Sequence, residues 1–181
     1  MRKAKGRRGK GASREAKKKR AAPRKSVRAK LYEYLGHPAD VGFVARGKTL
    51  EDVFAAAAQA MVAYGWELNR VKARETLEIR ARAATLEDLL YSWLSEVLFL
   101  ADAERWVFKT FAVHKVSAPA SPARSGVEGP PTLWEVRATA RGERFNKQQH
   151  RPRTYVKAVT YHQLAVRETR AGWQATIYLD V

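Results

Sequence analysis

Two segments of the chain carry apolar residues at helical spacing. Each segment follows the same four residues, Thr-Leu-Glu-Asp, at positions 49–52 and 85–88. A threonine N-cap with acidic residues in the first turn is typical of a helix start, because the acids complement the helix dipole. The pattern predicts one helix from Thr49 to about Tyr64, ended by Gly65, and a second helix from Thr85. The 36-residue spacing suggests a quasi-repeat with the two helices side by side, although a good capping sequence alone would also explain the identical starts.

The remaining apolar positions mostly alternate with polar ones, which is typical of half-buried strands. Such segments cover residues 31–35, 41–45, 76–82, 105–117, 132–145, 154–168 and 173–181. A stretch rich in Pro, Ser, Ala and Gly at 118–131 predicts a long loop. Two amphipathic helices need a sheet to cover. The predicted fold class is therefore α+β, in two layers, with two adjacent helices packed on a mostly antiparallel sheet of five or more strands.

The charge of the chain divides it into two unequal parts. The formal net charge is +17, and residues 1–30 account for +14 of it, with 15 Lys or Arg and a single acid, Glu15. This segment has almost no large apolar side chain, so it cannot repay the entropy of ordering. We therefore expect residues 1–30 to form a disordered basic tail and residues 31–181 to form the folded domain. The tail suits attraction to RNA, and it suits equally a role as a solubilising extension.

Composition narrows the classes of protein that fit. The chain has 181 residues and no cysteine, so disulfides and thiolate metal sites are excluded. No apolar run approaches the roughly 20 residues that span a bilayer, and the basic start lacks the apolar segment of a secretory signal. These features predict a cytoplasmic protein.

The first predicted strand ends in a corner, Gly36-His37-Pro38-Ala39-Asp40, that leads directly into the second strand. Gly36 supplies backbone freedom and Pro38 fixes φ, so the pattern predicts a tight turn with Asp40 at the mouth of the next strand. The last strand offers possible partners for Asp40: the side chain of Asp180 and the main-chain carboxylate of Val181.

Three separated motifs resemble the archease family. They are YEYLGHPADV at residues 32–41, KAVTYH at 157–162 and the chain end IYLDV at 177–181. The resemblance covers residues 31–181. It implies an accessory protein, not itself an enzyme, that activates a GTP-dependent RNA-splicing ligase of the RtcB type. The family promotes guanylylation and multiple turnover of this ligase in tRNA splicing and RNA repair.

The resemblance also implies a divalent metal site, most often seen with calcium, formed by Asp40, Asp180 and Val181. Such carboxylate oxygens are hard donors that suit Ca²⁺, Mg²⁺ or Mn²⁺. Lys157 matches the motif lysine, which could balance the carboxylates or contact the ligase or a nucleotide phosphate. His37 is kept as a partner or second-layer residue.

The sequence departs from the family motif at Gly36, where the family has Asp, and at Pro38, where it has Thr. Losing that Asp removes a possible hydrogen-bond acceptor for His37. Read without the family, Asp40 would be a turn acid, Asp180 an exposed strand end and Lys157 an ordinary surface lysine.

Two other functions stay open. The tail and surface aromatic residues could make the chain an RNA-binding module or RNA chaperone. A small metal-dependent hydrolase is a third class, but the sequence shows no nucleophile–base constellation, no Gly-rich phosphate loop and no HExxH helix. His114, His150 and His162 show no metal-ligand spacing and receive no role.

Overall fold

The computed structural model describes residues 31–35, 41–118 and 133–181. The predicted basic tail, the corner that holds His37 and Asp40, and nearly all of the predicted loop at 118–131 lie outside these residues. Among the described helices, none is long and apolar enough to cross a membrane.

The helices and strands follow the predicted order closely. The helices are α1 (Leu50–Gly65) and α2 (Leu86–Asp102), and a 3-10 turn occupies Leu68–Arg70. The strands are β1 (Tyr32–Leu35), β2 (Val41–Gly47), β3 (Glu75–Ala83), β4 (Trp106–Ser117), β5 (Trp134–Arg144), β6 (Ala158–Thr169) and β7 (Gly172–Asp180).

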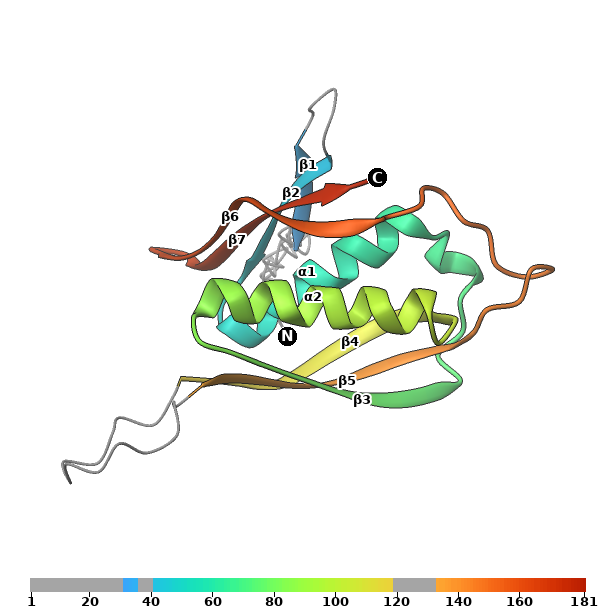
Figure 1. Ribbon diagram of the computed structural model, residues 1–181, viewed down its shortest axis with the longest axis horizontal. Coiled ribbons are helices and arrows are strands. Elements are labelled where there is room, and N and C mark those ends of the chain that lie inside the picture. Colours follow the sequence, from blue (N-terminus) through green and yellow to red (C-terminus); the bar gives the residue numbers. More distant parts are fainter. Residues whose placement is uncertain (1–30, 36–40, 119–132) are drawn as a thin grey trace, which may run out of the picture.

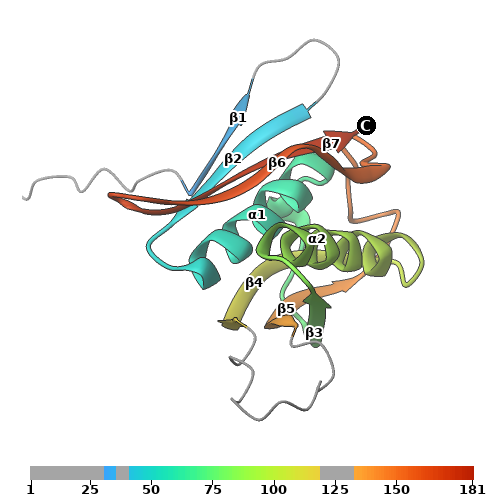
Figure 2. The same cartoon turned by 60° about the vertical axis from the view of Figure 1, so that its left-hand side comes forward.

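The strands form two antiparallel sheets with the helices between them (Figures 1 and 2). The first sheet has the order β1-β2-β7-β6 and the second has the order β3-β5-β4. The α+β class, the antiparallel pairing and the two adjacent helices are confirmed. The two-layer arrangement on one sheet of five or more strands is not observed, because the helices lie between sheets of four and three strands. Alternation shows which face of a strand is apolar but not which strands pair, so the division into two sheets could not be predicted.

Both helices begin with the predicted caps. The hydroxyl oxygen of Thr49 accepts a hydrogen bond from the Asp52 backbone N–H at 3.2 Å, and the Asp52 carboxylate accepts one in return from the Thr49 N–H at 3.2 Å. Thr85 accepts in the same way from Asp88 at 3.1 Å. These bonds satisfy N–H groups that have no partner within the helix.

The glutamate inside each Thr-Leu-Glu-Asp sequence ties its helix to the edge of a sheet. Glu51 of α1 accepts from the Val116 N–H of β4 at 3.0 Å, and Glu87 of α2 accepts from the Val166 N–H of β6 at 3.2 Å. β4 and β6 are the edge strands of the second and first sheets. The repeated sequence therefore marks two equivalent helix starts. In each case the glutamate bonds to the opposite sheet: α1 follows the first sheet and bonds to the second, and α2 follows the second sheet and bonds to the first.

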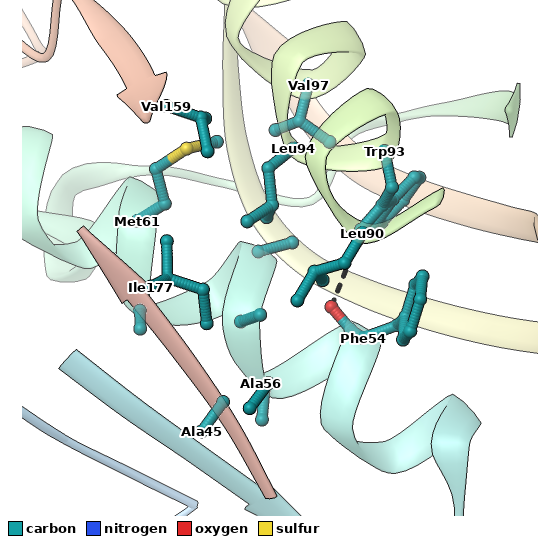
Figure 3. Close-up of a cluster of buried hydrophobic side chains, with 14 of the residues drawn as sticks. Ala45, Phe54, Ala56, Met61, Leu90, Trp93, Leu94, Val97, Val159 and Ile177 are labelled. Atoms are coloured by element: carbon teal, nitrogen blue, oxygen red, sulfur yellow. Dashed lines mark hydrogen bonds between the residues drawn. The ribbon is translucent and has the colours of Figure 1, made fainter. Parts of the chain in front are cut away.

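The core lies where the two helices meet the inner faces of the sheets (Figure 3). The Trp93 indole N–H of α2 donates to the Phe54 carbonyl of α1 at 3.0 Å, and both residues are fully buried. Ala56, Ala57 and Ala58 are also buried, and their small side chains allow neighbouring elements to approach α1 closely. This packing holds the first sheet, and with it the C-terminus, in a fixed position.

Candidate functional site

The chain ends inside the first sheet, between the starts of two other strands. β7 lies between β2 and β6, with Leu179 opposite Val41 and Asp180 opposite Ala158. Val181 therefore follows directly at the end of the sheet where β2 and β6 begin.

Lys157, Asp180 and Val181 lie together there. The Lys157 backbone N–H donates to the Asp180 carbonyl at 2.8 Å, which places the lysine beside the chain end. Its ammonium group donates to the Val181 terminal oxygen at 2.8 Å and lies 3.7 Å from Asp180 Oδ1. The side chains of Lys157 and Asp180 are 55% and 58% exposed, so a partner can reach both charges.

Asp40 and His37 lie outside the described residues, so their predicted roles stay predictions. The register nevertheless fixes Val41, the residue after Asp40 in the chain, opposite Leu179 of β7. Within residues 31–35, 41–118 and 133–181, no group of three His, Cys, Asp or Glu side chains is arranged to hold a metal.

The oxygen atoms of this strand end already attract one cation. The Asp180 carboxylate and the main-chain oxygen of Val181 share the Lys157 ammonium. Exposed ion pairs are worth about 0–1 kcal/mol, so the Lys157 ammonium is weakly held and can exchange for another cation. The described donors, Asp180 Oδ1 and the main-chain oxygen of Val181, are hard ligands of the kind that Ca²⁺ and Mg²⁺ prefer. The residues present therefore fit a divalent cation chemically.

Beside this strand end, an aromatic ring covers a glycine. A Cβ placed on Gly42 would lie 2.7 Å from Cε1 of Tyr178, so only glycine fits beneath the ring. His162 meets the same ring edge-on, with centroids 5.2 Å apart. The sequence assigned no role to these residues. The strand register, which places Gly42 opposite Tyr178 and Tyr178 opposite Thr160, is needed to find them.

A buried Glu143–His150 pair lies away from the strand end. His150 Nδ1 accepts from the Asn146 backbone N–H at 2.9 Å, so Nε2 carries the proton that is donated to Glu143 at 3.0 Å. The Lys72 N–H also donates to Glu143, at 2.7 Å, and Arg74 lies 3.4 Å away. Both ring nitrogens of His150 are therefore used in hydrogen bonds that join β5 to the connection after it, so we assign the pair a structural role.

Burial opposes ionisation of Glu143. The hydrogen bonds from His150 and Lys72 and the charge of Arg74 outweigh that effect, and together they lower the pKa of Glu143 below its ordinary value. No sequence signal marks this pair, because Glu143 continues the polar positions of β5 and His150 lies in a polar connection.

A pocket of about 260 Å³ opens between the C-terminal ends of α1 and α2 and the connection that leads to β6. Trp66, Phe145 and Tyr155 contribute aromatic walls. The Tyr155 hydroxyl donates to the Asp102 carboxylate at 3.0 Å, and this hydrogen bond raises the pKa of Tyr155. The pocket is mainly apolar and none of the predicted site residues lines it.

Comparison with known proteins identifies the family. A model of the archease protein family matches residues 32–181, which include Lys157, Asp180 and Val181. The chain belongs to the archease family. The resemblance inferred from the three motifs is therefore confirmed.

Individual archeases match over nearly their whole length. The chain is 36% identical to protein archease of Methanosarcina mazei over 152 residues, which are 84% of this chain and 97% of that protein. It is 31% identical to protein archease of Pyrococcus abyssi over 153 residues, which cover 84% and 99% of the two chains.

A solved structure agrees with the archease fold described above. The solution structure of Methanobacterium thermoautotrophicum protein 1598 superposes with a TM-score of 0.67 at 30% identity. The match covers 84% of this chain and 99% of that one.

Proposed function

We propose that the chain is an accessory protein that activates a GTP-dependent RNA-splicing ligase of the RtcB type. It promotes guanylylation and multiple turnover of the ligase in tRNA splicing and RNA repair, in the cytoplasm, without catalysing a reaction itself. Membership of the archease family supports this function. The observation that carries the proposed site is the exposed contact of Lys157 with the terminal carboxylate, beside Asp180.

A multiple-turnover RNA-ligation assay with the ligase from the same organism, GTP and divalent metal tests this function. Wild type should raise the number of turnovers. Asp180→Asn and Lys157→Gln should lose most of the stimulation, because each removes one of the charges that the ligase would meet. Glu168→Gln is the matched control: it neutralises an exposed acid on β6 of the same sheet, away from the strand end. The function is refuted if wild type gives no stimulation, and the site is refuted if all three variants stimulate equally.

We also propose that Asp40, Asp180 and Val181 bind a divalent cation, with calcium preferred and magnesium or manganese as alternatives. When bound, the cation supplies positive charge to the surface that meets the ligase. The chain's own contribution is to hold two carboxylates at one strand end and to supply Lys157 as an exchangeable cation.

Calorimetric titration of the protein with CaCl₂ measures this directly. Asp180→Asn should abolish the binding heat, and Lys157→Gln should strengthen binding because a competing ammonium is removed. A free calcium concentration of 100 times the Kd should also raise the free energy of unfolding by about 2.7 kcal/mol. Unchanged binding in Asp180→Asn would contradict the proposed ligands.

The net charge of +14 in residues 1–30 favours a second candidate, an RNA-binding module or RNA chaperone that acts through the tail. Deleting these residues should abolish the function in that case. Under the ligase-activator proposal, the shortened protein should keep most of its stimulation in the ligation assay.

A further inference from the structure

The second sheet has a charged outer face. The helices cover its other side (Figures 1 and 2), and the inner residues Ile79, Val136 and Ala138 are buried. The outer face carries five exposed cations, Arg80, Arg82, Lys115, Arg137 and Arg141.

Three of these cations lie in one row across all three strands. Arg80 of β3 is directly opposite Arg137 of β5, and Arg137 is directly opposite Lys115 of β4. With strands about 4.8 Å apart, the row spans about 10 Å. Like charges placed directly opposite one another destabilise a sheet, so the row imposes a cost on folding.

The acids on the same face offset this cost only in part. Glu135 lies 3.2 Å from Arg82 and 3.1 Å from Arg137, and Glu78 lies 3.2 Å from Arg80. Over residues 76–82, 110–117 and 135–141, the outward side chains include five cations and two acids, which is a net charge of +3 with His114 counted as neutral. The face therefore keeps a positive potential after its internal ion pairs are formed.

The outer face of the first sheet has no such row among its described residues. At the comparable place Gln174 of β7 lies opposite both Arg46 of β2 and Arg167 of β6, so a neutral side chain separates the two cations. Arg46 is also paired with Glu33 at 3.4 Å. The cation row is thus a property of the second sheet and not a general effect of a basic protein.

We propose that the outer face of the second sheet binds the phosphate backbone of an RNA strand. A row of cations complements the regular negative charge of such a backbone, and arginine suits phosphate oxygens through its planar fork of donors. The described outward positions of β3, β4 and β5 carry no Phe, Tyr or Trp on which bases could stack, so binding depends on the backbone and not on base sequence. The choice of RNA rests on the proposed function.

The test is fluorescence anisotropy with a labelled 20-nucleotide single-stranded RNA and the full-length protein. The variant Arg80→Gln/Lys115→Gln/Arg137→Gln removes the row. The matched control Arg46→Gln/Arg167→Gln/Arg170→Gln removes three exposed arginines from the strands and the β6–β7 turn of the first sheet. Both proteins keep residues 1–30, so any binding by the tail is the same in each.

Each lost phosphate contact on a single strand reduces the slope of log K against log salt by about 0.7. The row variant should therefore lower the slope by about 2 and weaken binding by up to about a hundredfold at 0.1 M salt. The control should match wild type. A further variant, Glu78→Gln, should tighten binding, because it removes a negative charge beside the row.

Equal slopes for wild type, the row variant and the control would overturn the proposal, as would unchanged or weaker binding by Glu78→Gln. A strong preference between two RNAs of unrelated sequence would overturn backbone recognition. The assay contains no ligase, so its failure is distinguishable from a failure of the proposed function, which the ligation assay detects separately. Circular dichroism confirms that each variant is folded.

Discussion

The buried Glu143–His150 pair makes a sharp prediction about stability. Glu143→Gln keeps the size of the side chain but removes the negative charge of the carboxylate. That carboxylate accepts hydrogen bonds from Lys72, Gln149 and His150. All three donors meet Oε1, so the glutamine carbonyl can replace that oxygen, while the new NH₂ group takes the place of Oε2 and faces the Arg74 guanidinium. The buried NH₂ group then meets a cation instead of an acceptor. Because an unsatisfied buried donor costs about 1–3 kcal/mol, we expect the free energy of unfolding to fall by about that amount.

Urea unfolding followed by tryptophan fluorescence measures this loss. Trp66 reports on the region directly, since its ring lies 6.5 Å from that of His150. The control is Glu78→Gln, which neutralises a carboxylate that is 74% exposed and paired only with a surface arginine. That change should alter the free energy of unfolding by less than about 0.5 kcal/mol.

The lowered pKa of Glu143 also predicts how the effect of Glu143→Gln on stability depends on pH. Because the folded state lowers the pKa of Glu143, the unfolded chain takes up this proton first as pH falls. The stabilisation is therefore complete above the ordinary glutamic acid pKa, and it is lost as pH falls through the lowered value. The difference between wild type and Glu143→Gln should shrink over this range. A difference that is constant down to pH 3, or equal losses in Glu143→Gln and Glu78→Gln at pH 7, would refute the reasoning.

Three further changes test other parts of the fold. Gly42→Ala should cost about 1–3 kcal/mol, because its Cβ meets the ring of Tyr178 at 2.7 Å; an unchanged melting temperature would contradict this packing. Trp93→Phe removes the indole N–H bond to the Phe54 carbonyl and shortens a fully buried side chain, so it should lower the free energy of unfolding, measured by urea unfolding, by about 1–3 kcal/mol; a neutral result would mean that the bond adds nothing. Thr49→Ala should cost about 1 kcal/mol through the lost cap of α1, and calorimetry that finds no loss would argue against the cap.

The sequence predicts the individual elements well, because helical and alternating periods are local properties. Thr49 and Thr85 mark both helix starts correctly. The predicted bounds of the last strands agree closely with the observed bounds, except that β6 begins at Ala158 and not at residue 154. The backbone N–H of Lys157, just before β6, already bonds to Asp180, while residues 154–156 lie outside the ladder.

Features that depend on register could not be predicted. Arg80, Lys115 and Arg137 are far apart in the chain, and only strand pairing places them in a row. The division into two sheets is not encoded in any single strand, and the Glu143–His150 pair depends on how the chain after β5 folds back. At the candidate site, the three motifs led to Lys157, Asp180 and Val181, which do meet. The roles of Asp40 and His37 stay predictions.

The most direct test of the central claim is the rate of ligase guanylylation in a single turnover. The comparison is between wild type and a version with four residues added after Val181. The addition moves the terminal carboxylate away from Lys157 and leaves every other residue unchanged. Wild type should accelerate guanylylation and the extended protein should not. Equal acceleration by both proteins would show that the C-terminal strand end is not the site through which the chain acts.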